Sequence, residues 1–277
     1  MALKLMYITN NPNIARIAED AGVDRIFVDM EYIGKAARQG GMDTVQSHHT
    51  IDDVRSVRKV ISKADVMVRI NPIHEASSEY SSSEKEINDA IDAGADILML
   101  PYFKTVEEVK MFLRYVHNRV RTLLLLETPE AVNVIDEILL LEGIDEIHIG
   151  LNDLSLGYGK KFMFELLADG TVEELCVKFK LKGIPYGFGG IAAIGKGELP
   201  AEYIIKEHYR LGSTCAILSR SFCNTNIITD MDEIRSAFKN GVYEIREQER
   251  ECEEHASYFR ENKRLVVDRV KEICRNK

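Results

Sequence analysis

A single pattern, an amphipathic helix followed by a glycine-containing turn and a short apolar strand, occurs four times along this chain and restricts its possible folds. The copies cover residues 14–31, 87–101, 134–150 and, more loosely, 204–220. Each copy has a glycine where the C-terminus of a helix favours a left-handed residue, at Gly22, Gly94, Gly143 and Gly212. Strands that alternate with helices in this way form parallel sheets.

Further apolar runs between the copies indicate how many strands the sheet has. They cover residues 3–8, 66–70, 123–126 and 184–188. About eight strand-and-helix units within roughly 225 residues predict a (β/α)8 TIM barrel. A doubly wound open sheet is the alternative with the same alternation.

The composition changes near Gly241, and this change predicts two parts in the chain. Residues 1–240 would form the barrel and catalytic domain, and residues 241–277 an extended C-terminal helical arm that is dense in charge. Val266, Val270 and Ile273 recur at helical spacing and give the arm an apolar stripe to bury. The arm could pack on its own barrel or dock on a neighbouring subunit, and the sequence favours neither.

Charge and cysteine content exclude several classes of function. The formal charge of −9 over 277 residues argues against binding to nucleic acid or to an anionic membrane surface. No apolar run approaches the length of a membrane span, and the start of the chain has no signal-peptide core. The five cysteines show no CxxC spacing, so we expect a reduced, cytoplasmic protein without a disulfide framework.

Two acids that follow neighbouring predicted strands are the strongest functional signal. Glu127 ends the apolar run 123–126, and Asp153 follows the run 147–150. Two parallel strands that each end in an acid can hold one divalent cation, because Mg²⁺ and Mn²⁺ prefer oxygen ligands. Taken singly, Glu127 could be a first-turn helix acid and Asp153 an N-cap. As a pair they predict a metal site.

Other polar residues also follow predicted strands, and in a barrel those ends form the active face. Asp29, Glu31 and Tyr32 follow the second strand, and Arg69 ends the third. Arg69 could be an ion-pair partner of these acids or could bind the carboxylate of a substrate with its planar fork. The Gly-rich loop 187–197 follows the seventh strand and is a weak candidate for binding phosphate.

The histidines fall into two groups. His117, His148 and His208 lie within helix or strand patterns and are expected to be structural. Loops after predicted strands contain the others, His48, His49 and His74, which could reach the active face.

Several motifs together resemble one family, the HpcH/HpaI aldolase and citrate lyase β-subunit family of the phosphoenolpyruvate/pyruvate barrel superfamily. The matching segments, which span roughly residues 5–225, are Phe27–Glu31, Val68–Asn71, Gly94–Asp96 through Leu100-Pro101, Glu127–Val132 and Ile149–Ser155.

This resemblance implies a metal-dependent aldolase site of class II. Glu127 and Asp153 match the metal-binding acids, and Arg69 matches the arginine that steadies the enolate. The backbone of Gly150, Leu151, Asn152 and Asp153 matches the segment that receives the substrate carboxylate. The reaction implied is cleavage of a 4-hydroxy-2-oxo acid to pyruvate and an aldehyde through a metal-bound enolate. The family also implies a homo-oligomer, a trimer or hexamer.

The chain departs from the family pattern after the second strand. Tyr32 stands where such aldolases usually have a histidine, and the loop that follows, residues 33–47, is expanded. Leu125 also replaces a glutamine of the family. We therefore expect His48 or His49 to supply the general base near Asp29 and Glu31. Two alternatives remain: a citrate-lyase-like or other pyruvate-enolate enzyme, and a non-catalytic barrel that binds a metal and a keto acid.

Overall fold

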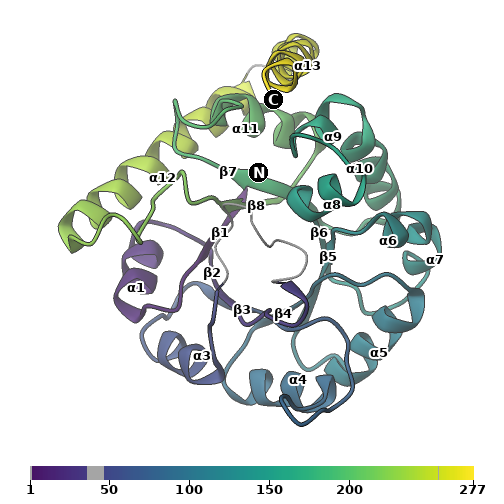
Figure 1. Ribbon diagram of the computed structural model, residues 1–277. Coiled ribbons are helices and arrows are strands. Elements are labelled where there is room, and N and C mark those ends of the chain that lie inside the picture. The colour runs from purple at the N-terminus through teal and green to yellow at the C-terminus, as the bar shows by residue number, and fades with distance from the viewer. Residues whose placement is uncertain (1, 36–46, 255) are drawn as a thin grey trace.

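A closed parallel barrel forms the centre of the protein, as the repeat predicts, and excludes the open sheet. The computed structural model describes residues 2–35, 47–254 and 256–277. Each strand pairs with the next in chain order, and β8 closes the barrel on β1 (Figure 1). The strands are β1 Lys4–Ile8, β2 Arg25–Asp29, β3 Asp65–Arg69, β4 Ile97–Leu100, β5 Arg121–Leu126, β6 Glu146–Ile149, β7 Tyr186–Ile191 and β8 Cys215–Leu218.

Helices surround the barrel, and threonines begin several of them. The Thr50 and Thr105 side chains form capping boxes with Asp53 and Glu108 at the start of α3 and α5. Thr128 caps α6, whose first residue is Pro129. The helices are α1 Pro12–Asp20, α3 Ile51–Arg58, α4 Ser83–Asp92, α5 Val106–Val116, α6 Pro129–Asn133, α7 Ile135–Ile138, α8 Leu151–Gly157, α9 Glu165–Ala168, α10 Thr171–Lys182, α11 Ala201–Leu211, α12 Met231–Glu254 and α13 Phe259–Arg275, with the short 3₁₀ helix η1 Ala256–Tyr258 between the last two.

Two apolar cores position the strands. The larger lies between strands and helices, and the smaller consists of strand residues that include Met6, Phe27 and Leu123. Arg25 and Glu146, the first residues of β2 and β6, form a buried ion pair with two hydrogen bonds of 2.7 and 2.6 Å. This ion pair lies at the N-terminal ends of the strands. In barrels of this type the active site lies at the opposite, C-terminal ends.

The C-terminal helices lie against the barrel that precedes them (Figure 1). The predicted boundary between residues 240 and 241 falls inside α12, so the arm does not begin at a break between helices. Val266, Val270 and Ile273 on α13 are buried, and α13 contacts α9 and α11 of its own chain. Assembly into a trimer or hexamer stays a prediction. No helix in the described part of the chain is both long and apolar enough to cross a membrane.

Candidate active site

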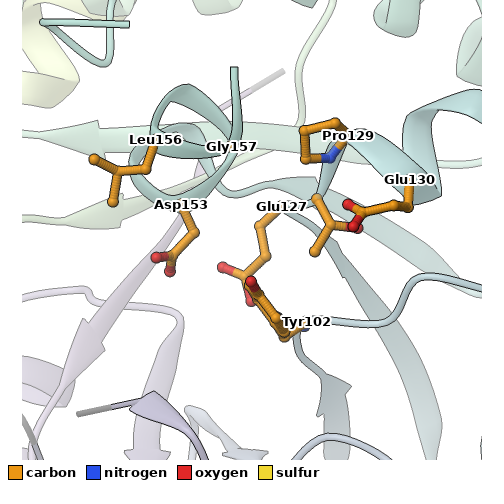
Figure 2. Close-up of a pocket in the computed structure, with 8 residues that line it drawn as sticks. Tyr102, Glu127, Pro129, Glu130, Asp153, Leu156 and Gly157 are labelled. Carbon is orange, nitrogen blue, oxygen red and sulfur yellow. Dashed lines mark hydrogen bonds between the residues drawn. The ribbon is translucent and has the colours of Figure 1, made fainter. Parts of the chain in front are cut away.

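Glu127 and Asp153 become neighbours because β5 and β6 pair in register. Leu126 at the end of β5 pairs with Ile149 at the end of β6, so the residues that follow emerge side by side. Both acids line a cavity of about 390 Å³ beside β5 and β6. Their carboxylates point into the same space (Figure 2). The remaining residues that line the cavity are Tyr102, Thr128, Pro129, Glu130, Leu156 and Gly157.

Glu127 lies in an environment that disfavours its own negative charge. The side chain is only 3% exposed. Burial raises the pKa of Glu127 well above its usual range, and repulsion from Glu31 and Asp153 raises it further, while Arg69 opposes the shift. A carboxyl with this pKa shift beside a second acid is stabilised in its charged form when a cation binds between them.

The loop after β4 holds Glu127 in place. The backbone N–H of Tyr102 donates a 3.0 Å hydrogen bond to Oε1 of Glu127. Tyr102 has a φ of 48°, in the left-handed region that bulky residues rarely adopt. Thr128 Oγ1 donates to the carbonyl of the next residue, Phe103, at 2.7 Å, so bonds on both sides of Tyr102 maintain this backbone. Strain of this kind costs roughly 1–3 kcal/mol and is concentrated at functional sites.

A second group of charges surrounds the ends of β2 and β3. Asp29 and Arg69 are paired in the strand register, and Arg69 binds Asp29 with two hydrogen bonds of 2.7 Å. Nε of Arg69 also lies 3.4 Å from Glu31. Burial alone would raise the pKa of Asp29, but Arg69 and Lys35 outweigh it and hold that pKa well below its usual value. The ion pair predicted for Arg69 is therefore present, and its binding of a substrate carboxylate stays a prediction.

Lys35, which no sequence pattern singled out, also lies in this group. Its side chain is buried, with Nζ 2.9 Å from Asp29 Oδ2 and 3.4 Å from Glu31 Oε2. A single lysine in a loop is usually exposed, so the sequence contained no signal for this contact. The rest of the expanded loop, residues 36–46, lies outside the described residues.

The residues of these two groups suit one divalent cation. Among the described residues, the two groups comprise four carboxylates and two cationic side chains. The acids are Asp29, Glu31, Glu127 and Asp153, and the cations are Lys35 and Arg69. The described residues contain no group of three or more His, Cys, Asp or Glu side chains arranged as a metal cage. Mg²⁺ needs no such cage, since one or two carboxylates commonly suffice, with water and substrate as the other ligands.

The two candidate histidines differ in their environment. Nδ1 of His49 accepts a 2.9 Å hydrogen bond from the backbone N–H of Asp29. Burial lowers the pKa of His49, so the ring is neutral near pH 7 and its proton is on Nε2. A ring in that tautomer donates at Nε2, which argues against His49 as the general base. His48 is exposed.

Other polar residues considered from the sequence have structural surroundings. His74 contacts the carbonyls of Pro72 and Ser81 at 2.7 and 2.8 Å within its own loop. His148 and His208 are buried, as expected of structural histidines. The Tyr32 side chain is 48% exposed, and its backbone N–H donates to Asn71 Oδ1.

Comparisons with known proteins agree with this architecture. The chain matches the model of the HpcH/HpaI aldolase/citrate lyase family over residues 4–165. The crystal structure of a protein of that family from Burkholderia cenocepacia J2315 superposes with a TM-score of 0.61 at 16% identity, covering 84% of this chain and 94% of that one. For the HpcH/HpaI aldolase from Desulfitobacterium hafniense DCB-2 the TM-score is 0.57 at 18% identity, covering 78% and 86%. At these identities the two structures support the fold alone. No curated protein matches the chain.

Proposed function

Because the chain belongs to the HpcH/HpaI aldolase/citrate lyase family, which its match over more than half its length establishes, we propose that it is a carbon–carbon lyase. Its reaction is the cleavage of a 4-hydroxy-2-oxo acid to pyruvate and an aldehyde, with one divalent cation as cofactor. The observation that supports this most directly is the pair of converging carboxylates, Glu127 and Asp153, which line one cavity and point into the same space.

Glu127 and Asp153 are the residues that would hold the cation, and Mg²⁺ or Mn²⁺ suits their oxygen atoms. Such an ion, when bound, supplies Lewis-acid polarisation of the keto group of the substrate. The chain prepares the two ligands in advance. The Tyr102 N–H orients Glu127, and the first turn of α8 positions Asp153.

The substrate carboxylate is received by the start of α8. Gly150 occupies the N-cap position of this helix and provides no side chain to cap it. The first amides of a helix have no acceptor within the helix, so those of Leu151, Asn152 and Asp153 can donate to a carboxylate.

Arg69 stabilises the charge that forms as the bond breaks. In cleavage, a proton leaves the C4 hydroxyl, the C3–C4 bond breaks, and its electron pair forms the enolate of pyruvate. Among the contacts of the described residues, Asp29 binds Nε and Nη2 of Arg69, which leaves Nη1 for the developing oxyanion. Protonation of the enolate at C3 then yields pyruvate.

For the proton acceptor we propose His48, because the tautomer of His49 makes that ring a donor. His49 then acts as a positioning residue that supports the backbone at Asp29. Separate His48→Ala and His49→Ala variants test this assignment. We expect the first to slow cleavage by roughly 100-fold or more, as the loss of a general base does. An unchanged rate in His48→Ala rejects the role of His48.

Proton exchange on pyruvate tests the enolate half without knowledge of the aldehyde. With Mn²⁺ in D₂O, the wild-type protein should wash deuterium into the methyl group of pyruvate, and Glu127→Gln should not. The exposed Glu137→Gln provides a matched control with the same chemical change on α7. If the wild-type protein exchanges deuterium no faster than Glu127→Gln, the proposal that it is a pyruvate-enolate enzyme is rejected. Exchange without cleavage of any 4-hydroxy-2-oxo acid would instead favour another pyruvate-enolate reaction, such as that of the citrate lyase branch.

A further inference from the structure

The cavity beside Glu127 and Asp153 contains side chains that the proposed reaction does not use. We infer that they select the substrate: the group beyond the cleaved bond is uncharged and apolar, and Tyr102 and Leu156 contact it. This inference rests on the proposed function, because it concerns the second half of the same site.

The charges that line the cavity argue against a second carboxylate on the substrate. The charged lining residues among those described are Glu127, Glu130 and Asp153, and all of them are acids. A cation bound between Glu127 and Asp153 would compensate those two acids, and Lys104 already pairs with Glu130, so the described lining has no cation for an anionic group of the substrate. Burying a carboxylate without a cationic partner is costly.

The cations near the cavity already have partners. Lys35 contacts Asp29 and Glu31, and the proposed reaction assigns Arg69 to the keto-acid end. Lys104 Nζ lies 2.9 Å from Glu130 and 5.3 Å from the centre of the Tyr102 ring. No lysine or arginine lines the cavity among the described residues.

Apolar surface, by contrast, is present on two sides of the metal-binding acids. Tyr102 lies beside Glu127 and Leu156 beside Asp153, so the two side chains flank the carboxylates (Figure 2). The hydrogen bonds on both sides of Tyr102 hold its backbone in the left-handed conformation, and Lys104 lies over its ring. Tyr102 is thus preorganised, and Leu156 is 39% exposed, which leaves apolar area for a ligand to cover.

A matched pair of 2-oxo acids tests this selection by binding. The pair is 2-oxoglutarate and 5-methyl-2-oxohexanoate, which has two methyl groups in place of the two distal carboxylate oxygens. Calorimetric titration in the presence of Mn²⁺ should show that the apolar acid binds about tenfold more tightly or better.

Variants identify the surface responsible. Tyr102→Gly removes the ring but suits the left-handed backbone and keeps the N–H that binds Glu127. Tyr102→Gly and Leu156→Ala, made as separate variants, should each weaken binding of the apolar acid more than binding of pyruvate. Each should therefore reduce the ratio of the affinities for the two matched acids. Leu181→Ala on α10, at a position 82% exposed, should leave the ratio unchanged.

The outcomes separate this inference from the proposed function. If pyruvate exchanges deuterium but 2-oxoglutarate binds as tightly as its apolar counterpart, the selectivity is rejected and the lyase is not. An unchanged ratio in both Tyr102→Gly and Leu156→Ala rejects the assigned surface. If pyruvate neither binds nor exchanges, both proposals are rejected together.

Discussion

The α-carbon of Gly150 lies so close to Glu127 that a side chain at position 150 would collide with it. A Cβ atom there would be 2.8 Å from Cβ of Glu127 and 2.9 Å from its Oε2. Glycine is therefore needed for the close approach of two strand ends, and through it for the position of a proposed metal ligand.

Gly150→Ala should displace Glu127 and weaken Mn²⁺ binding by roughly 10- to 100-fold, the usual effect of disturbing a residue that supports a ligand. Overpacking should also lower the free energy of unfolding by about 1–3 kcal/mol. Calorimetry with Mn²⁺ and urea denaturation measure the two effects. Gly183→Ala is the control, because its φ of 69° makes alanine unfavourable while no atom lies within 4 Å of the added Cβ. If Gly150→Ala binds Mn²⁺ like the wild type, the contact with Glu127 does not position a ligand.

Arg69→Lys should lower kcat roughly 100- to 1,000-fold, because a lysine keeps the charge but not the planar fork that binds Asp29 and that we propose to bind the oxyanion. The charge of the group is unchanged, so we expect Mn²⁺ affinity to stay near that of the wild type. Steady-state kinetics and calorimetry on the same preparation separate the two quantities. A variant with full kcat would show that the fork has no part in the reaction.

Two buried histidines should each reduce the stability of the folded protein as the pH falls below 6.5, because they resist protonation, whereas the raised pKa of Glu127 acts in the opposite direction. Burial lowers the pKa of His148 from 6.5 to about 4 and that of His208 from 6.5 to about 3. Between pH 6.5 and the lowered pKa of each ring, the unfolded chain takes up a proton that the folded chain does not. The contribution of each ring to the free energy of unfolding is therefore complete above pH 6.5 and declines as the pH falls. The slope reaches about 1.4 kcal/mol per pH unit for each histidine.

Urea denaturation at several pH values measures this dependence. His148→Gln removes one of the two rings and should flatten the curve, whereas the exposed His117→Gln should not. Parallel curves for wild type and His148→Gln would show that His148 is protonated equally in both states.

Val270→Asp should reduce the free energy of unfolding by about 3 kcal/mol or more, since it places an unpaired charge at a position only 2% exposed. Leu181→Asp introduces the same carboxylate at an exposed position and should change stability by less than about 0.5 kcal/mol. Equal stability of the two variants would contradict the packing of α13 on its own barrel. Light scattering on the wild type tests the predicted trimer or hexamer separately.

Most of the barrel could be predicted from the sequence because strand and helix patterns are local. The apolar run 123–126 lies within β5 Arg121–Leu126, and the run 66–70 nearly coincides with β3 Asp65–Arg69. Gly22, Gly94, Gly143 and Gly212, predicted to be left-handed, all have positive φ. The spacing of apolar residues and glycines depends only on residues close together in the chain, so it can be recognised in a single sequence.

A residue at or directly after the end of a strand could be placed from the sequence. Glu127, Gly150 and Arg69 have places dictated by strand register, so their positions follow once a barrel is assumed. Residues in loops could not be placed in this way. His48 and His49 were indistinguishable in the sequence, and only the hydrogen bond from Asp29 shows that the His49 ring is a donor.

The sequence by itself determined the alternation of strands and helices, and with it the presence of an acid shortly after β5 and another shortly after β6. Tertiary structure decided three further features: the burial of Lys35 against Asp29, the left-handed Tyr102, and the raised pKa of Glu127. The physical reason is the range of the interactions. Secondary structure follows from residues a few positions apart, whereas desolvation, ion pairing and enforced backbone strain depend on groups that only the closed barrel brings together.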